Sequence, residues 1–196
     1  MIDITAVVEQ KLSPKRFQHS LNVAETAKEL ADKYGADEEK AYFCGLVHDV
    51  IKDAAKEEQL CIIEKSGIIL SSSEKANPKL WHAIAGAAYL RDELKITDED
   101  LFNAVCYHTT GRAGMSLLEK VVYVADFISA DRTYSGVGEM RRLAGISLES
   151  AMLFALEFCI KNLVETGQVI HTGSVDCYNE LIINRKKETG GFKEIK

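Results

Sequence analysis

The sequence contains few prolines and few cysteines. Only two prolines occur among 196 residues, and Ser13-Pro14 and Asn77-Pro78 both stand where a helix can begin, with proline at the first helical position. The cysteines are odd in number, and none has the spacing Cys-x-x-Cys. A chain of this length needs no disulfide to fold. We interpret the five as buried reduced thiols of a cytoplasmic protein, with a reactive thiol as the alternative.

Long apolar runs and an excess of positive charge are also missing. No apolar stretch approaches the ~18 residues that a membrane-spanning helix needs, and Met1–Thr5 lacks the basic and apolar parts of a signal peptide. Acidic residues outnumber basic ones by 30 to 24, which gives a net charge of −6 and a pI of about 5.4. This balance disfavours sequence-independent binding of nucleic acid. We therefore expect no membrane or nucleic-acid partner.

Apolar residues recur at spacings of three and four, and no segment alternates as a strand would. The pattern predicts an all-α fold of nine or ten helices in a single domain over residues 1–196. Residues 68–76 and 109–114 are predicted loops, a capping box is predicted at Thr97-x-x-Asp100, and the tail, residues 188–196, is predicted to be frayed. The predicted helices run from Pro14 to Gly35, from Asp37 through Val47, over 55–66, from Pro78 through Tyr89, from Asp100 toward His108, over 115–129, through the 140s after a loop with Gly136 and Gly138, from Ser147 to near Gly167, and from about Val175 to Lys187.

Histidine and aspartate carry most of the chemical information. His48 is followed directly by Asp49, and Asp126 lies within the most apolar helical segment. A carboxylate on an apolar helix is costly to bury unless it is paired or bound to a metal. Imidazole and carboxylate together suit iron, manganese or zinc. Adjacent side chains do not share a helix face, but around a helix terminus His48 and Asp49 can converge on one ion.

Cationic side chains are spaced to lie beside these ligands. Arg16 and His19 are three residues apart, as are Asp49 and Lys52, so each pair can share a helix face. An anionic substrate would arrive at such a place. Taken singly, each of these residues has an ordinary structural explanation: a lone histidine is more often a core or surface residue, and Lys52 could simply offset a helix dipole.

The ordered set of His19, His48-Asp49, His82, His108 and Asp126 resembles the HD-domain superfamily of metal-dependent phosphohydrolases. The superfamily pattern is a histidine, a His-Asp pair and a distant aspartate, and some branches add two histidines between them. The local sequences are similar to the YqeK branch, also described as an HD hydrolase linked to NAD metabolism, over about residues 15–184. They are Arg16-Phe17-x-His19, His48-Asp49-x-x-Lys52-Asp53, His82-x-x-x-Gly86, His108-Thr109-Thr110-Gly111 and Ala125-Asp126-x-Ile128-x-x-x-Arg132.

The resemblance implies an all-α enzyme that binds iron, or manganese as the alternative, and hydrolyses diadenosine tetraphosphate symmetrically to two ADP. It implies these site residues: His19, His48, Asp49 and Asp126 as metal ligands; His82 and His108 as ligands of a second ion or as contacts to the phosphates; Lys52, Thr109 and Arg132 as nucleotide contacts; and Ile170, His171, Thr172, Gly173, Ser174 and Val175 as a nucleotide-contacting turn. The branch more often has proline where Thr172 stands.

The residue types agree with this chemistry. A divalent metal lowers the pKa of a bound water and polarises a phosphoryl oxygen, so that attack at a β-phosphorus would expel ADP. Lys52, Arg132 and Arg16 would neutralise phosphate charge. Asp49 would bind the metal and orient the water, and His82 or His108, near pH 7, would protonate the departing oxygen.

Two other functions would use the same residues. The first is an HD hydrolase of another specificity: a mononucleotide phosphatase, a nucleoside triphosphate hydrolase or a cyclic-nucleotide phosphodiesterase. The second is a nucleotide-binding regulatory module without turnover, which would be expected to have lost a histidine or an aspartate of the set. The sequence leaves open whether one or two ions bind. A homodimer is expected because two-fold dimers are the commonest oligomers.

Overall fold

In the computed structural model, which describes residues 3–188, the chain folds into eleven α-helices and one short 3₁₀-helix, and these residues contain no β-strand. The all-α prediction is confirmed, with more helices than the nine or ten expected. The elements are α1 (Ile4–Lys11), α2 (Pro14–Tyr34), α3 (Glu38–Val47), α4 (Lys56–Lys65), α5 (Ser72–Ala76), η1 (Pro78–Leu80), α6 (Trp81–Asp92), α7 (Glu99–Cys106), α8 (Leu117–Ile128), α9 (Val137–Ala144), α10 (Leu148–Glu165) and α11 (Thr172–Glu188).

Several helix ends lie where the sequence predicts them. Helix α2 begins at Pro14, whose missing N–H needs no partner in a first turn, and ends at Gly35, whose φ of 77° suits glycine. Asp37 caps α3 by accepting a hydrogen bond from the Lys40 N–H. The Ser147 side chain caps α10 in the same way. Ser13 occupies the N-cap position of α2, although its hydroxyl makes no capping hydrogen bond.

Two helices are absent from the sequence prediction. Helix α1 begins where the Asp3 carboxylate accepts hydrogen bonds from the N–H groups of Thr5 and Ala6. Helix α5 lies within residues 68–76, which we expected to be a loop. Its first turn has a capping box, in which Ser71 and Glu74 each accept from the other's backbone N–H. The loop prediction for residues 68–76 is therefore wrong for their second half.

Three further expectations need correction or lie outside the described part. The N-cap of α7 is Asp98, which accepts from the N–H groups of Asp100 and Leu101, so the capping box predicted at Thr97 is wrong. Gly138, expected in a loop, lies inside α9. Of the tail predicted to be frayed, residues 189–196 lie outside the described part of the chain.

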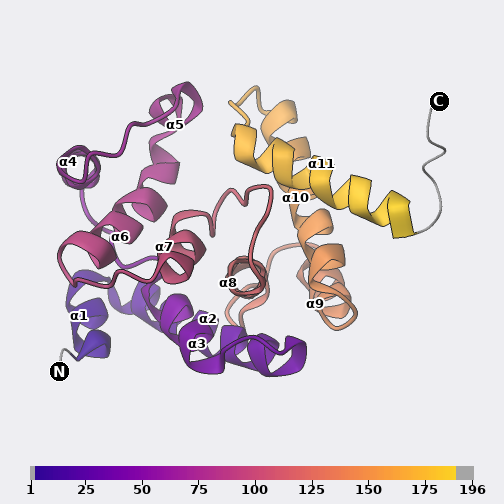
Figure 1. Ribbon diagram of the computed structural model, residues 1–196, viewed down its shortest axis with the longest axis horizontal. Coiled ribbons are helices and arrows are strands. Elements are labelled where there is room, and N and C mark those ends of the chain that lie inside the picture. Colours follow the sequence, from indigo (N-terminus) through magenta and orange to yellow (C-terminus); the bar gives the residue numbers. More distant parts are fainter. Residues whose placement is uncertain (1–2, 189–196) are drawn as a thin grey trace.

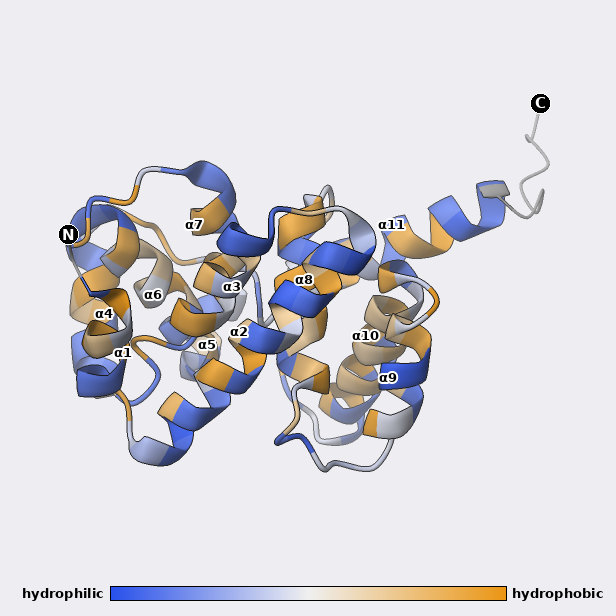
Figure 2. Cartoon of the chain, turned by 90° about the horizontal axis from the view of Figure 1, so that it is seen from below, coloured by the Kyte–Doolittle hydropathy of each residue, from blue (hydrophilic) through white to orange (hydrophobic). Residues whose placement is uncertain are grey.

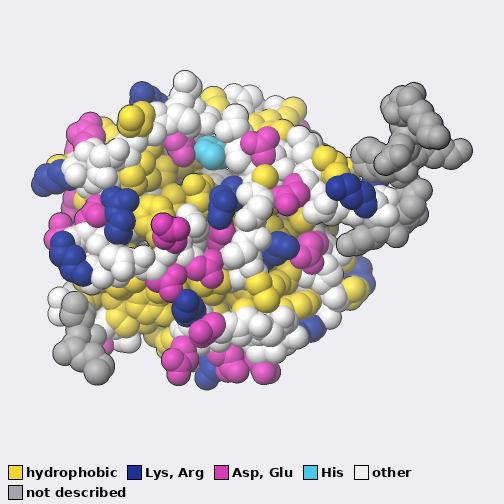
Figure 3. Space-filling model, in the orientation of Figure 1, with side chains coloured by type: hydrophobic (Ala, Val, Ile, Leu, Met, Phe, Trp, Pro, Cys, Tyr) yellow, Lys and Arg dark blue, Asp and Glu magenta, His cyan; other side chains and the backbone are white. Residues whose placement is uncertain are grey.

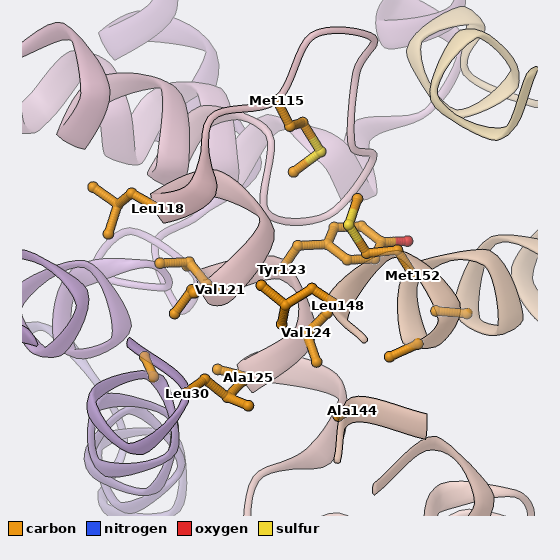
Figure 4. Close-up of a cluster of buried hydrophobic side chains, with 14 of the residues drawn as sticks. Leu30, Met115, Leu118, Val121, Tyr123, Val124, Ala125, Ala144, Leu148 and Met152 are labelled. Carbon is orange, nitrogen blue, oxygen red and sulfur yellow. The ribbon is translucent and has the colours of Figure 1, made fainter. Parts of the chain in front are cut away.

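Helix α8 packs against helices from both halves of the chain. Figure 1 shows it between α1–α7 and α9–α11, and it packs against α2, α3 and α7 as well as α9 and α10. Its side chains Tyr123 and Val124 lie close to Leu148 and Met152 of α10 in a large buried cluster (Figure 4). Hydrophobic and hydrophilic residues alternate along α2 and α10 (Figure 2), as expected of amphipathic helices. A carboxylate on α8 is thereby held in the middle of the molecule.

Helices α2 and α3 approach each other closely at one glycine. A Cβ added to Gly45 would lie 2.6 Å from the Ala24 Cα and 2.8 Å from the Ala24 backbone nitrogen. Only glycine fits this crossing. Because His19 lies on α2 and His48 directly follows α3, the crossing also sets how far apart these two imidazoles are.

Side chains of both charge signs are interspersed on the face that Figure 3 shows. Within residues 3–188, no helix has the length and apolar character needed to cross a membrane.

All five cysteines are free. Cys44 and Cys177 are buried as expected, Cys106 and Cys159 are partly buried, but Cys61 is exposed, so the expectation of burial is wrong for it.

Candidate metal centre

The histidines and aspartates that the sequence singled out lie together where five helices meet. They come from α2, the end of α3, the first turn of α6, the turn after α7 and the last part of α8. Four imidazoles and one carboxylate are buried: His19, His48, Asp49, His82 and His108 each expose 4% or less of their surface. The sixth residue, Asp126, has a side chain that is 16% exposed.

The neighbouring residues His48 and Asp49 reach the same place because α3 ends directly before them. Val47 is the last residue of α3, and the chain continues in tight turns, with hydrogen bonds from Val50 N to Val47 O (3.0 Å) and from Lys52 N to Asp49 O (2.7 Å). The turns bring His48 Nε2 to 3.5 Å from Asp49 Oδ2. The expectation that the pair converges around a helix terminus is met by this geometry.

Three of the imidazoles each make the same kind of local hydrogen bond. His48, His82 and His108 each place Nδ1 within 2.6–2.7 Å of the backbone carbonyl three residues earlier. A carbonyl oxygen only accepts, so Nδ1 carries the hydrogen and donates it. In the neutral form of each ring, Nε2 is then left with a lone pair, and all three Nε2 atoms are directed into the centre. Fixing the far nitrogen in this way is typical of metal-binding histidines.

The converging atoms form two groups, one around each aspartate. In the first, His19 Nε2 and His48 Nε2 lie 3.0 and 3.9 Å from Asp126 Oδ1. In the second, His82 Nε2 and His108 Nε2 lie 3.2 and 3.6 Å from one oxygen of the other aspartate, Asp49 Oδ1.

Some of these atoms lack the hydrogen-bond partners that buried polar atoms ordinarily have. The Nε2 atoms of His82 and His108 are 3.3 Å apart, although both carry lone pairs. Within the described residues, His48 Nε2 and Asp49 Oδ1 are buried and have no hydrogen-bond partner. Ligand atoms of His19, His48 and Asp126, and of His48, Asp49 and His108, lie within 4.8 Å of one another. Such a donor set fits one or more divalent cations, since a cation removes the repulsion between lone pairs.

The electrostatic balance points the same way. Burial works against the charged form of His48, but the carboxylates of Asp49 and Asp126 outweigh it and raise its pKa. Burial would raise the pKa values of both aspartates, yet their histidine neighbours hold them well below the usual range. The carboxylates are therefore ionised and attract positive charge into the centre.

His82 behaves differently from the proton donor that we expected. Burial is the main cause that lowers the pKa of His82 to about 4. At neutral pH its ring is therefore uncharged, with the hydrogen on Nδ1 and the lone pair on Nε2. A neutral ring of this tautomer binds a cation and has no proton to give to a leaving group.

Predicted cationic residues line the centre. Arg16 Nη1 lies 2.9 Å from Asp49 Oδ2. Lys52 Nζ is 2.9 Å from His82 Nε2 and 3.5 Å from Asp49 Oδ1. Arg132 pairs with the Asp126 carboxylate and donates from Nε to its backbone carbonyl at 2.7 Å.

An open cavity lies beside these cations. Its volume is about 420 Å³, and its lining includes Arg16, His19, Arg132 and Tyr134. The Thr109 hydroxyl lies on another side of the centre, 3.1 Å from His108 Nε2. A larger cavity, of about 740 Å³, lies between α10 and α11 and is lined by none of the ligand residues.

The segment expected as a nucleotide-contacting turn is mostly helix. Residues 172–175 form the first turn of α11, which begins three residues earlier than predicted. His171 Nε2 lies 3.3 Å from Glu74 Oε1, and the Ser174 hydroxyl donates to the Thr110 carbonyl at 2.7 Å. Among the described residues, the segment is linked to the centre through the loop that contains Thr109 and Thr110. Thr109 and His171 line one small cavity. Ile170, Thr172, Gly173 and Val175 do not join the cluster of ligands.

One carboxylate at the centre was missed by the sequence interpretation. Asp131, in the loop after α8, places Oδ2 2.8 Å from His19 Nδ1. It is the only carboxylate among the described residues that pairs with that nitrogen. An aspartate at a loop start has many ordinary roles, so no pattern in the sequence distinguishes it.

Comparison with known proteins gives the family of the chain and similar proteins. The HD domain profile matches residues 16–131. A protein of Bacillus subtilis named symmetrical bis(5'-nucleosyl)-tetraphosphatase is 39% identical, over 90% of this chain and 95% of its own. A protein of the same name from Halalkalibacterium halodurans is 37% identical, over 92% and 96%.

A solved structure extends the likeness to three dimensions. The crystal structure of a predicted HD superfamily hydrolase involved in NAD metabolism, from Clostridium acetobutylicum, is 39% identical, with a TM-score of 0.89 over 92% of this chain and 96% of that one. The family profile, the two relatives and the solved structure each match more than half of the chain. The chain belongs to the HD domain family.

Proposed function

We propose that this protein is a metal-dependent hydrolase that cleaves diadenosine tetraphosphate symmetrically into two ADP. One observation carries the proposal. Three buried imidazoles donate Nδ1 to backbone carbonyls and direct their Nε2 lone pairs toward two ionised aspartates, beside Arg16 and Lys52. The names of the two relatives support the choice of substrate, since each is a symmetrical bis(5'-nucleosyl)-tetraphosphatase aligned over nearly its whole length.

We further propose that two ions bind and share Asp49. His19, His48 and Asp126 would hold the first, with Asp49 between the two, and His82 and His108 would hold the second. The distances of 3.2 and 3.6 Å from Asp49 Oδ1 to these last two rings support this arrangement over contact with phosphate. Iron is the first choice of metal and manganese the second, because imidazole and carboxylate ligands suit both.

The bound ions and the cationic side chains would have different roles in the reaction. Bound divalent ions supply an activated water and polarise a phosphoryl oxygen. Arg16, Lys52 and Arg132 neutralise the phosphate charges and hold the chain of phosphates in place. Lys52 offsets the negative charge of the departing ADP. This charge would replace the proton that we expected from His82 or His108, since His82 is neutral.

Product analysis tests the reaction. The protein is loaded with Fe²⁺ or Mn²⁺ and incubated with diadenosine tetraphosphate, and the nucleotides are separated by ion exchange. ADP as the only product is the expected result. AMP with ATP would contradict symmetrical cleavage, and no turnover with either metal would contradict the proposed substrate. Mononucleotides, nucleoside triphosphates and cyclic nucleotides are tested in parallel, because a faster rate on any of them would also overturn the substrate assignment.

Removing the metal is expected to abolish turnover and to lower the melting temperature. A ligand at a thousandfold excess over its Kd stabilises the folded state by about 4 kcal/mol. Dialysis against a chelator, followed by return of Mn²⁺, should remove and then restore both properties. Elemental analysis of the reloaded protein is expected to give two ions per chain. A melting temperature that is unchanged by chelation, in a protein shown to be metal-free, would contradict the proposed centre.

A further inference from the structure

His19 is the one imidazole of the centre that is not fixed by a backbone carbonyl. Its Nδ1 lies 2.8 Å from Asp131 Oδ2 instead. Its Nε2 lies 3.0 Å from Asp126 Oδ1, its partner in the first ligand group, and 3.3 Å from Arg132 Nη2. When Nε2 binds a cation, the hydrogen of the neutral ring belongs to Nδ1, where the Asp131 carboxylate accepts it.

Asp131 is itself held in a defined position. Its other oxygen, Oδ1, accepts from Asn22 Nδ2 at 3.1 Å and from the hydroxyl of Ser129 at 3.0 Å. Ser129 is fully buried and follows the last residue of α8. Asn22 lies on α2, one turn after His19. The carboxylate thus joins α2 to the end of α8, the two helices that carry His19 and Asp126.

The negative charge of Asp131 bears on its role. Asp131 lines the cavity beside the centre together with Lys15, Arg16 and Arg132. An anion in this cavity opposes the approach of a polyphosphate, so attraction of the substrate does not explain it. Its geometry toward His19 does.

We propose that Asp131 is a positioning residue that fixes the tautomer and orientation of His19 for metal binding. The inference rests on the proposed metal centre. A carboxylate that accepts from the far nitrogen raises the basicity of a metal-binding imidazole, and loss of such a partner typically weakens metal binding about 10- to 100-fold. Asp131 touches neither the substrate nor the reacting atoms in this role, so its effect acts through His19.

Mn²⁺ binding to the whole protein, measured by calorimetry, is the direct test. Asp131→Ala is expected to weaken binding about 10- to 100-fold. Asp131→Asn should lose less, because the amide oxygen still accepts a hydrogen bond. The matched control is Asp53→Asn, which removes a charge from the same cavity at a residue whose carboxylate accepts from Ser13 N. The control is expected to bind Mn²⁺ as the wild type does.

Kinetics separates positioning from substrate binding. At saturating Mn²⁺, kcat of the Asp131 variants should return toward the wild-type value, while KM for diadenosine tetraphosphate stays the same or falls. Wild-type Mn²⁺ affinity in Asp131→Ala would overturn the inference, and so would a raised KM with unchanged metal affinity. A wild-type protein that binds no Mn²⁺ would count against the metal centre itself, which distinguishes the two failures.

A measurement on the wild type keeps the inference testable if the variants fail to fold. Nitrogen-15 NMR of histidine-labelled protein, without metal, reports which nitrogen of each ring carries hydrogen. Hydrogen on His19 Nδ1 is the expected result. Hydrogen on Nε2 alone would overturn the role assigned to Asp131.

Discussion

Replacing Asp49 by alanine should remove metal from the protein and lower turnover by on the order of 10³-fold or more, since bound metal contributes several kcal/mol of transition-state stabilisation and each 1.36 kcal/mol is a factor of ten. Asp49 contacts imidazoles of both ligand groups. Its Oδ1 faces His82 and His108, and its Oδ2 lies 3.5 Å from His48 Nε2. No other described carboxylate is placed to take over both contacts.

The measurement combines elemental analysis with single-turnover kinetics. Circular dichroism establishes that Asp49→Ala is folded, and Asp53→Asn, four residues further along the chain, is the matched control with wild-type metal content. Retention of full activity by Asp49→Ala would disprove the assignment of the metal centre. Loss of metal without loss of activity would separate the centre from the reaction and contradict the proposed mechanism.

The second large effect is expected at the crossing of α2 and α3. Gly45→Ala introduces a Cβ that would lie 2.6 Å from the Ala24 Cα, and the contacted atoms are backbone, which cannot move aside as a flexible side chain can. Forcing extra atoms into a packed core costs about 1–3 kcal/mol, and occasionally more. We expect a loss at the upper end of this range in the free energy of unfolding, measured with urea.

The same substitution should also weaken Mn²⁺ binding, because it moves His48 relative to His19. Gly138→Ala is the matched control: this glycine lies inside α9, and beyond the neighbouring backbone of its own helix nothing lies within 4 Å of the added Cβ. In an open helical position, alanine is favoured over glycine by about 0.5–1 kcal/mol. If Gly45→Ala were as stable as Gly138→Ala, the crossing would not be as tight as the structure has it.

The long helices could be predicted from the sequence because local signals and the apolar pattern agree there. Pro14 and Gly35 mark the two ends of α2, and Ser147 marks the start of α10. Helix α5 shows where the approach fails. Its capping box, Ser71 with Glu74, is present in the sequence, but a serine-rich segment with almost no buried side chain lacks the apolar period on which helix prediction depends.

The candidate centre could be predicted as a set of residues but not as a geometry. His19 and Asp126 are 107 positions apart, and their side chains meet only because α2 packs on α8. The pKa of His82 follows from burial, which no local pattern reveals. Asp131 shows the same limit, because its role depends on a contact with a residue 112 positions away. Residues 172–175 were misjudged as a turn because resemblance of a short segment says little about where a helix begins.

The hydrogen bonds that orient the imidazoles have a consequence for tolerance to mutation. The rings of His48, His82 and His108 are oriented by main-chain carbonyl oxygens, and every amino acid supplies such an oxygen. Substitutions at Lys79 or Val105 that preserve the local backbone therefore leave those tautomers unchanged. His19 has no such protection, because a single base change that alters Asp131 removes its partner. Random mutagenesis should therefore find loss-of-metal variants at residue 131 more readily than at Lys79 or Val105, whose carbonyl oxygens orient His82 and His108.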